Sequence, residues 1–316
     1  MSVVGLGCWQ FGEPGWGYGT QYSEPEVQAV VRRALELGVT VFDTAELYGR
    51  GASEVLLGRA LRGWTGDTFL ATKFLPVLPL PGVMVSHLEA SLERLGVAAV
   101  DLYQLHFPNP AVPVPIQAEG LRRVLELGLT RHVGVSNFSL RRWSQTERAL
   151  GRPVISNQVH YNLLQRKPER GLLEYAQRHS RVLLAYSPLA QGVLSGRYRA
   201  GALPDDRRRL RPLYSEAALA AATPLLEALS EIAAAHAAKP AQVALAYLLS
   251  HPRVVVIPGA KSVAQLEENV AAAEIELAQD EVQALRGASD RFHFSRARAV
   301  AEVLGRLSSG RRRTPA

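Results

Sequence analysis

Eight short apolar segments alternate with amphipathic stretches along the 316 residues, and this rhythm constrains the fold more than any other feature. The segments are rich in β-branched residues, as strands are. They are Val3–Cys8, Val39–Asp43, Thr68–Thr72, Val100–His106, His132–Ser136, Val154–Val159, Val182–Tyr186 and Val254–Pro258. Helical periodicity follows most of them, for example over Glu24–Leu37, Val83–Leu95 and Leu140–Leu150. Short links between strands and helices imply parallel pairing, so the sequence predicts a parallel α/β fold.

Eight strand–helix units in about 300 residues match a (β/α)8 TIM barrel, which needs about 250 residues plus insertions. The rival is a doubly wound nucleotide-binding sheet, whose first strand usually runs into Gly-x-Gly-x-x-Gly. Here Gly5-Leu6-Gly7 is followed by four other residues before Gly12, so the third glycine is misplaced. We therefore expect one barrel domain over residues 1–307 that includes an added C-terminal helix, Arg296–Leu307.

The last residues carry most of the net charge. The chain has a formal charge of +7, yet residues 291–316 alone contain seven Arg and one Glu, so the remainder is nearly neutral. An Arg-rich end could contact phosphate backbones, but such an end is more often a frayed terminus. We expect residues 308–316 to form a basic, disordered tail, and we expect no nucleic-acid partner.

Three further features indicate a cytoplasmic protein without a membrane partner. No apolar run is expected to approach the roughly 20 residues that cross a bilayer. The chain opens as a strand rather than as a basic and then apolar leader. A single cysteine, Cys8, excludes an intramolecular disulfide and a zinc site built on several thiolates. The oligomeric state stays open.

Polar residues recur where the predicted strands end. Chemistry in such barrels lies at the carboxyl ends of the strands. The second strand ends in Asp43 with Tyr48 in the next loop, the third runs into Lys73, and the fourth ends in His106. The later strands run into Ser136, Asn137, Gln158, Tyr186, Ser187 and the run Gly259-Ala260-Lys261-Ser262. Each residue alone has a structural explanation, such as a helix cap or a rim lysine, but their coincidence on one rim favours a functional site.

The residue types at this rim suggest proton transfer. A tyrosine has an ordinary pKa of about 10, and an adjacent ammonium group stabilises its phenolate and lowers that pKa. Lys73 can supply the ammonium to Tyr48 if Asp43 holds it, and a neutral His106 can orient a carbonyl oxygen. No metal-ligand set is visible, and Ser136 lacks the closing glycine of G-x-S-x-G. A site with a proton donor and no nucleophile needs an external reductant or another cofactor.

Motifs along residues 3–275 resemble the aldo-keto reductases in order and spacing. They are Phe42-Asp43-Thr44-Ala45-Glu46-Leu47-Tyr48-Gly49, Ala71-Thr72-Lys73, Asp101-Leu102-Tyr103-Gln104-Leu105-His106, Val133-Gly134-Val135-Ser136-Asn137-Phe138, Asn157-Gln158-Val159-His160-Tyr161-Asn162, Ala185-Tyr186-Ser187-Pro188-Leu189 and Ile257-Pro258-Gly259-Ala260-Lys261-Ser262. The last motif resembles most the branch with the voltage-gated potassium-channel β-subunits and their bacterial relatives.

The resemblance implies a barrel that binds NADP(H) in an extended pose and reduces an aldehyde or ketone to an alcohol. Tyr48 would be the proton donor in a tetrad with Asp43, Lys73 and His106, and Trp9 would line the substrate pocket. The residues implied for cofactor binding are Ser136, Asn137, Gln158, Tyr186, Ser187, Pro188, Leu189, Ala190, Gln191, Arg197, Gly259, Lys261, Ser262, Gln265, Glu268 and Asn269. The alternative is a regulatory protein that senses NADP(H) with little turnover.

Two departures from the family pattern and one irregular segment complete the expectations. Many members begin with a β-hairpin that plugs the barrel, whereas this chain starts within the first strand. Gln265 stands where many members place an arginine against the 2′-phosphate, which leaves dual use of NADH and NADPH open. The stretch 192–212 is predicted to form either a belt over the cofactor or a flexible surface insertion.

Overall fold

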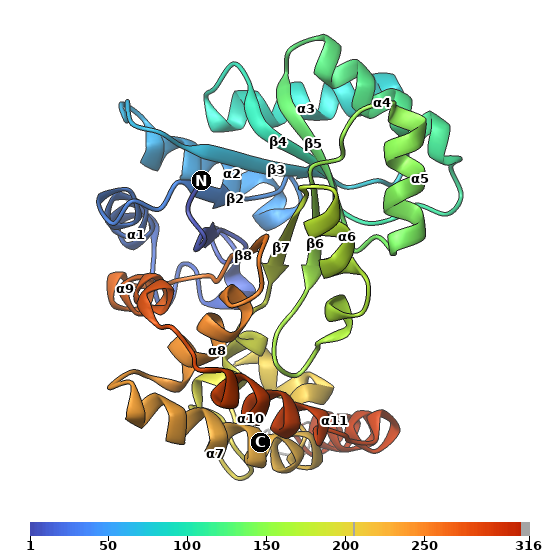
Figure 1. Ribbon diagram of the computed structural model, residues 1–316. Helices are drawn as coiled ribbons and strands as arrows, with labels where there is room; N and C mark the ends of the chain where they lie inside the picture. The colour runs from blue at the N-terminus through green and yellow to red at the C-terminus, as the bar shows by residue number, and fades with distance from the viewer. Residues whose placement is uncertain (205, 311–316) are drawn as a thin grey trace.

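The computed structural model describes residues 1–204 and 206–310, with only the backbone at 207 and 307–310. Eight parallel strands form one sheet in chain order, and each lies where the sequence predicts a strand (Figure 1). They are β1 (Leu6–Gly7), β2 (Val41–Asp43), β3 (Phe69–Phe74), β4 (Val100–Leu105), β5 (Thr130–Ser136), β6 (Ser156–His160), β7 (Val182–Tyr186) and β8 (Val254–Val256).

Backbone hydrogen bonds join the first strand region to the last and close the barrel. The amide of Gly5 donates to the carbonyl of Val256 at 2.8 Å, and that of Gly7 donates to the carbonyl of Pro258 at 3.0 Å. Buried aliphatic side chains such as Val41, Leu102 and Ile257 form a cluster separate from the larger core between sheet and helices. The predicted (β/α)8 barrel is therefore confirmed.

Helices follow the strands and form the outer ring. The first six are α1 (Glu24–Glu36), α2 (Ala52–Leu61), α3 (Pro81–Leu95), α4 (Val114–Glu126), α5 (Leu140–Leu150) and α6 (Leu172–Arg178). The later ones are α7 (Glu216–Ala235), α8 (Pro240–Leu249), α9 (Val263–Ala271), α10 (Gln279–Asp290) and α11 (Arg296–Gly310). Gly96 ends α3 in a left-handed conformation with φ 70°, which glycine adopts without strain.

Helix α7 corrects the expectation that no apolar run approaches the length of a membrane span. Its 20 residues are apolar enough to span a bilayer by length and composition, and it is the one such helix in the described part of the chain. The sequence reading missed it because its apolar character rests largely on alanine. Its buried residues, such as Leu219, Leu225 and Leu229, recur at helical spacing, and the helix packs against α8 and α10. Burial within the barrel's outer layer accounts for this composition.

Helix α11 begins at Arg296 as expected and continues to Gly310, three residues past the predicted end. It lies beside α7 and α10 in Figure 1 and contacts α7. Arg306 at its far end donates to the carbonyl of Tyr214 at 2.9 Å, which ties the helix to the segment that follows β7. Residues 311–316 of the predicted tail lie outside the described residues.

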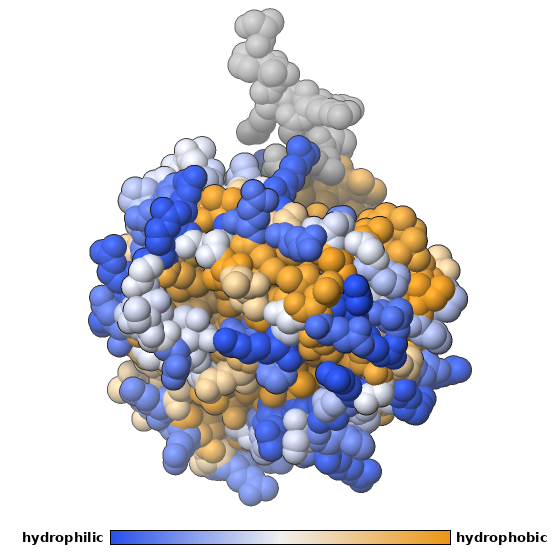
Figure 2. Space-filling view, turned by 90° about the horizontal axis from the view of Figure 1, so that it is seen from above, coloured by the Kyte–Doolittle hydropathy of each residue, from blue (hydrophilic) through white to orange (hydrophobic). Residues whose placement is uncertain are grey.

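Several large apolar side chains remain on the surface. Figure 2 shows one face of the molecule, on which apolar patches lie between hydrophilic residues. Three of the exposed side chains lie on loops that leave the carboxyl ends of strands: Trp9 after β1, Val77 after β3 and Phe107 after β4. The rim that the sequence singled out therefore also carries apolar side chains.

Candidate active site

Asp43, Lys73 and Tyr48 meet at the carboxyl ends of β2 and β3. The ammonium group of Lys73 lies 2.6 Å from Oδ2 of Asp43 and 2.7 Å from the carbonyl oxygen of Thr44. Its third hydrogen bond goes to the hydroxyl oxygen of Tyr48 at 3.2 Å. The side chain of Lys73 is fully buried, so it is not a rim lysine that reaches solvent. All three donor sites of the ammonium are used, which fixes its position.

The other carboxylate oxygen of Asp43 accepts two amide hydrogen bonds. Nε2 of Gln158 lies 2.7 Å from Oδ1, and Nε2 of Gln104 lies 3.3 Å from it. The sequence reading missed Gln104, although a signal exists. It pairs in register with Lys73 and precedes His106 by two residues, which places both on the same face of β4.

The pKa values in this group follow from burial and from the neighbouring charges. Burial alone lowers the pKa of Lys73, but Asp43 and Tyr48 more than offset it, so the pKa lies above its ordinary value. Burial raises the pKa of Tyr48, and Lys73 opposes this rise only in part. The expectation that Lys73 brings the pKa of Tyr48 below 10 is therefore wrong for the protein alone, because desolvation of the phenolate outweighs the attraction of the ammonium.

His106 lies edge-on to Tyr48, with 5.6 Å between ring centroids and an interplanar angle of 79°. Its other neighbour is Phe107, which stacks on it at 4.6 Å. Burial, helped by the charge of Lys73, lowers the pKa of His106 to about 3. The imidazole is therefore neutral near pH 7, as the sequence analysis expected. Its Nδ1 is buried and has no hydrogen-bond partner among the described residues.

Four of the residues predicted to bind the cofactor form one connected group. The Ser136 hydroxyl donates to the Gln158 carbonyl at 2.9 Å, and the Asn137 amide donates to the Ser136 hydroxyl at 3.0 Å. The Tyr186 hydroxyl in turn donates to Oδ1 of Asn137 at 3.0 Å. Since Gln158 also bonds Asp43, this group is continuous with the tetrad.

Tyr186 presents a flat surface beside this group. Its ring stacks on His160 at 5.3 Å, with only 10° between the planes. Because one face rests on His160 and the side chain is only partly buried, the opposite face is the one that can receive another ring.

The backbone after β7 forms a strained turn. Ser187, Ala190 and Gln191 have φ values of 50°, 48° and 58°, in the left-handed region that non-glycine residues rarely adopt. Pro188 and Ala190 are buried, and Leu189 is partly buried. The buried Oε1 of Gln191 has no hydrogen-bond partner within residues 1–204 and 206–310. Such strain and an unpaired polar atom are common where a ligand binds.

The segment 192–212 crosses toward the loop that follows β1. Arg208 pairs with Asp206 at 2.8 Å, donates to the Gln191 carbonyl at 2.9 Å, and lies over the ring of Trp16 at 5.8 Å. The Tyr214 hydroxyl donates to the same carbonyl at 2.8 Å. These contacts favour the belt over the flexible insertion. Arg197, also predicted to bind the cofactor, is exposed on this segment.

The residues predicted to hold the adenosine end gather around the start of α9. Ser262 caps the helix by accepting from the Gln265 amide at 3.3 Å, and the backbone amide of Lys261 donates to Oε1 of Gln265 at 2.9 Å. Gly259 pairs with Gly7 of β1, and Asn269 is buried. The carboxylate of Glu268, also predicted to bind the cofactor, forms an ion pair with Lys239.

Trp9, in the loop that follows β1, lies next to Tyr48 of the tetrad. Its ring centroid lies 6.3 Å from that of Tyr48 and 5.1 Å from that of Trp16, which meets it edge-on. With an exposed fraction of 37%, it offers an aromatic wall at the mouth of the site.

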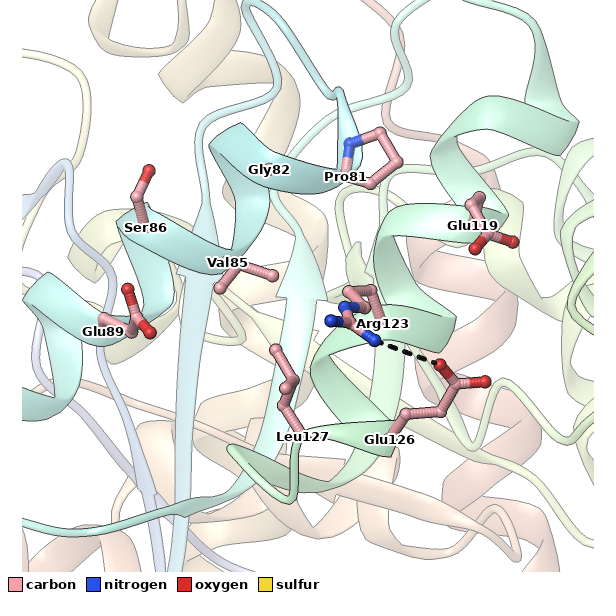
Figure 3. Close-up of a pocket in the computed structure, with 9 residues that line it drawn as sticks. All are labelled: Pro81, Gly82, Val85, Ser86, Glu89, Glu119, Arg123, Glu126 and Leu127. Atoms are coloured by element: carbon pink, nitrogen blue, oxygen red, sulfur yellow. Dashed lines mark ion pairs between the residues drawn. The ribbon is translucent and has the colours of Figure 1, made fainter.

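A surface groove between α3 and α4 is a separate feature. The lining residues drawn in Figure 3 include Val85 and Glu89 on α3, Arg123 on α4, and Leu127 directly after α4. Its one drawn ion pair joins Arg123 to Glu126 at 3.9 Å, along the same helix. None of the predicted site residues lines this groove, so the rim around Tyr48 is the better candidate.

Comparisons with known proteins agree with this architecture. The model of the Aldo/keto reductase family matches residues 3–290. An uncharacterised oxidoreductase of Mycobacterium tuberculosis is 48% identical over 292 residues, 92% of this chain and 90% of its own length. An aldo-keto reductase [NADP(+)] of Schizosaccharomyces pombe is 32% identical, with 92% of this chain and 89% of its own length covered.

A solved structure of an aldo-keto reductase has the same fold as this chain. The aldo-keto reductase of Klebsiella pneumoniae in complex with NADPH has a TM-score of 0.74 and 28% identity, and the match covers 93% of this chain and 95% of that one. The finer expectation, a place in the branch of the channel β-subunits, stays a prediction. The chain belongs to the aldo/keto reductase family.

Proposed function

We propose that the protein is an NADPH-dependent reductase that converts an aldehyde or ketone to an alcohol. The observation that carries the proposal is the position of the Tyr48 hydroxyl, 3.2 Å from an ammonium group that Asp43 and Thr44 hold in place. The names of the Schizosaccharomyces pombe relative and the Klebsiella pneumoniae structure, which refer to NADP(+) and NADPH, support the choice of cofactor.

The residues around the rim fit this cofactor. Ser136, Asn137 and Gln158 offer amide and hydroxyl groups to a carboxamide, and the free face of Tyr186 suits a nicotinamide ring. The turn Ser187–Gln191 and the start of α9, with Lys261 before it, suit phosphate groups, since helix N-termini and basic side chains attract anions. When bound, the reduced nicotinamide supplies a hydride to the carbonyl carbon.

Tyr48 would donate the proton that completes the reduction. Its oxygen accepts a hydrogen bond from Lys73, so its own O–H is directed elsewhere and can point to a carbonyl oxygen. Neutral His106, edge-on to the same ring, would donate a second hydrogen bond to that oxygen and orient it.

Lys73 would stabilise the charge that the proton transfer leaves on Tyr48. The pKa of Tyr48 is raised by burial, which keeps it protonated until the developing alkoxide takes the proton. The ammonium group, already pointed at the phenolic oxygen, then faces the phenolate without having to move. Gln104 and Gln158 hold the Asp43 carboxylate in place, and Asp43 in turn holds the ammonium group of Lys73. All three residues therefore act through Lys73.

The proposal is tested by following NADPH oxidation with 4-nitrobenzaldehyde. Tyr48→Phe is expected to retain NADPH binding and to lose roughly 10²- to 10⁴-fold in kcat, the usual contribution of a positioned proton donor. Tyr175→Phe on α6 is the matched control and should keep wild-type turnover. Full activity of Tyr48→Phe would rule out the mechanism.

A regulatory role is the second candidate. The expected result in that case is tight NADPH binding by the wild-type protein with no turnover across a panel of aldehydes and ketones. The intact Asp43–Lys73–Tyr48 contacts favour retained chemistry. Residues 308–310 of the predicted tail lie in helix α11 instead. The cytoplasmic location and the disorder expected of residues 311–316 stay predictions, as does the preference for NADPH over NADH.

A further inference from the structure

We propose that Arg211 recognises a carboxylate on the substrate, so that the enzyme prefers flat, apolar aldehydes or ketones that carry an acid group. The inference rests on the proposed function and names its substrate class. Its starting point is the contact of Arg211 with Trp9, the aromatic wall next to Tyr48.

The geometry places a guanidinium group at the mouth of the site. The guanidinium carbon of Arg211 lies 5.9 Å from the centre of the Trp9 ring, and that ring lies 6.3 Å from the ring of Tyr48. Together these distances put the guanidinium carbon within about 12 Å of the centre of the Tyr48 ring. A single small aromatic compound can bridge that gap.

Arg211 also differs from its charged neighbours. Arg208, three residues earlier, is occupied by Asp206 and the Gln191 carbonyl. Glu46, on the loop before Tyr48, bonds His87 at 2.8 Å and the Leu75 amide. In the described part of the chain no carboxylate pairs with Arg211, whose side chain is exposed. A guanidinium group that already rests on an aromatic ring is oriented for a two-pronged bond to a carboxylate.

The two tryptophans separate this arginine from the groups suited to the cofactor. Arg208 and Lys261 both lie 5.8 Å from the Trp16 ring, on the side of β7 and α9 where the phosphates are expected. Trp16 meets Trp9 edge-on, and Arg211 lies on Trp9. Arg211 therefore contacts the tryptophan that neighbours Tyr48, whereas Arg208 and Lys261 contact the other one.

Exposed aromatic side chains flank Tyr48 and His106. Trp9 is 37% exposed and Phe107 43% exposed, and Phe107 stacks on His106 while Trp9 neighbours Tyr48. Two exposed rings beside the two residues that would face a carbonyl oxygen suit a flat substrate. The acid group would then extend toward Arg211.

The experiment compares two aldehydes of one shape, 4-carboxybenzaldehyde and 4-nitrobenzaldehyde, at saturating NADPH and low salt. The ratio of their kcat/KM values is expected to fall roughly tenfold in Arg211→Gln, because a charge-assisted pair is lost. Arg199→Gln removes the same charge from the same segment and should leave both activities unchanged. Arg211→Lys should recover part of the ratio.

Three results would overturn the inference: an unchanged ratio in Arg211→Gln, an equal fall in Arg199→Gln, or a tenfold weaker binding of NADPH by Arg211→Gln, which would assign the arginine to the cofactor. Calorimetric titration of benzoate into the NADP(+)-bound protein gives a readout independent of turnover, and Arg211→Gln should weaken it roughly tenfold. If wild type reduces neither aldehyde, the proposed function fails while benzoate binding still decides the role of Arg211.

Discussion

Two buried networks in this barrel contain the same residue types, an acid, a cation and tyrosine. One is the group of Asp43, Lys73 and Tyr48 at the rim. The other surrounds Glu169, between the loop after β6 and helices α8 and α10. Its carboxylate accepts from Arg166 at 3.0 Å, from the Tyr161 hydroxyl at 3.0 Å and from the Tyr247 hydroxyl at 2.9 Å.

The two networks differ in what their tyrosines bond. In the Glu169 network both hydroxyls donate their protons to the carboxylate, and burial together with Glu169 raises the pKa values of Tyr161 and Tyr247. At the rim the tyrosine oxygen accepts from an ammonium group, and its proton is left for a substrate. On the proposed mechanism, the partner of the phenol, rather than the residue types, therefore separates the proton donor Tyr48 from the structural tyrosines of the Glu169 network.

Replacing the cation should have the largest effect of the variants considered. At the rim it should lower both turnover and stability, whereas in the Glu169 network it should lower stability alone. Lys73→Met removes the ammonium group that faces Tyr48 and leaves Asp43 buried without a counter-ion. We expect kcat to fall roughly 10²- to 10⁴-fold and the free energy of unfolding to fall by about 3–5 kcal/mol. Turnover of 4-nitrobenzaldehyde and urea denaturation measure the two effects.

Two further variants separate folding from chemistry. The double variant Asp43→Asn, Lys73→Met removes both charges, so it should recover most of the stability and none of the turnover. Arg166→Met breaks the corresponding pair in the Glu169 network and should cost stability while kcat stays within about twofold. Wild-type turnover in Lys73→Met would contradict the role of the rim network.

Acid should destabilise the rim through His106. The pKa of His106 is about 3 in the folded protein and about 6.5 in the unfolded chain, so between these values only the unfolded chain binds the proton. Stability is complete above pH 6.5 and is lost as the pH falls toward 3. From pH 6.5 to 4.5 this loss amounts to about 2 kcal/mol, and His106→Gln should escape it. Urea denaturation at both pH values measures it.

His251 of the Glu169 network provides the comparison. Burial also lowers the pKa of His251, but Glu169 and the backbone of Tyr247 oppose that change. His251→Gln should therefore relieve less of the acid loss than His106→Gln does. If all three proteins lose equal stability between pH 6.5 and 4.5, the low pKa of His106 is wrong.

The rim could be predicted from the sequence because a barrel brings strand ends together. Asp43, Lys73 and His106 each follow a recognisable apolar segment, and the fold alone places them on one edge. Tyr48, in the loop that follows Asp43, joined them because a phenol beside an ammonium group can donate a proton, and the family resemblance implies the same role. Geometry supplied what spacing could not, such as the second amide on Asp43 from Gln104.

The Glu169 network and the contacts of Arg211 could not be predicted in this way. Tyr161, Glu169 and Tyr247 lie on a loop, a short helical turn and a helix, and no strand register relates them. Arg211 meets Trp9 only because residues 192–212 fold across the rim, and nothing in the spacing of the two residues indicates this. Which residues meet between irregular segments depends on the packing of the whole fold, whereas the order of the strands alone decides which strand ends lie together.

Tyr161→Phe is the smallest change to the molecule, and it sharpens the comparison most. The variant removes one hydroxyl donor from the buried Glu169 carboxylate, while Tyr247 and Arg166 keep theirs. A hydrogen bond to a charged group contributes about 1.5–3 kcal/mol, so urea denaturation should show a loss of that size with kcat within about twofold. Tyr48→Phe should do the opposite, because Lys73 keeps Asp43 and Thr44 as partners and only the proton donor is lost. A Tyr161→Phe variant of full stability and reduced turnover would show that the two networks are coupled rather than distinct.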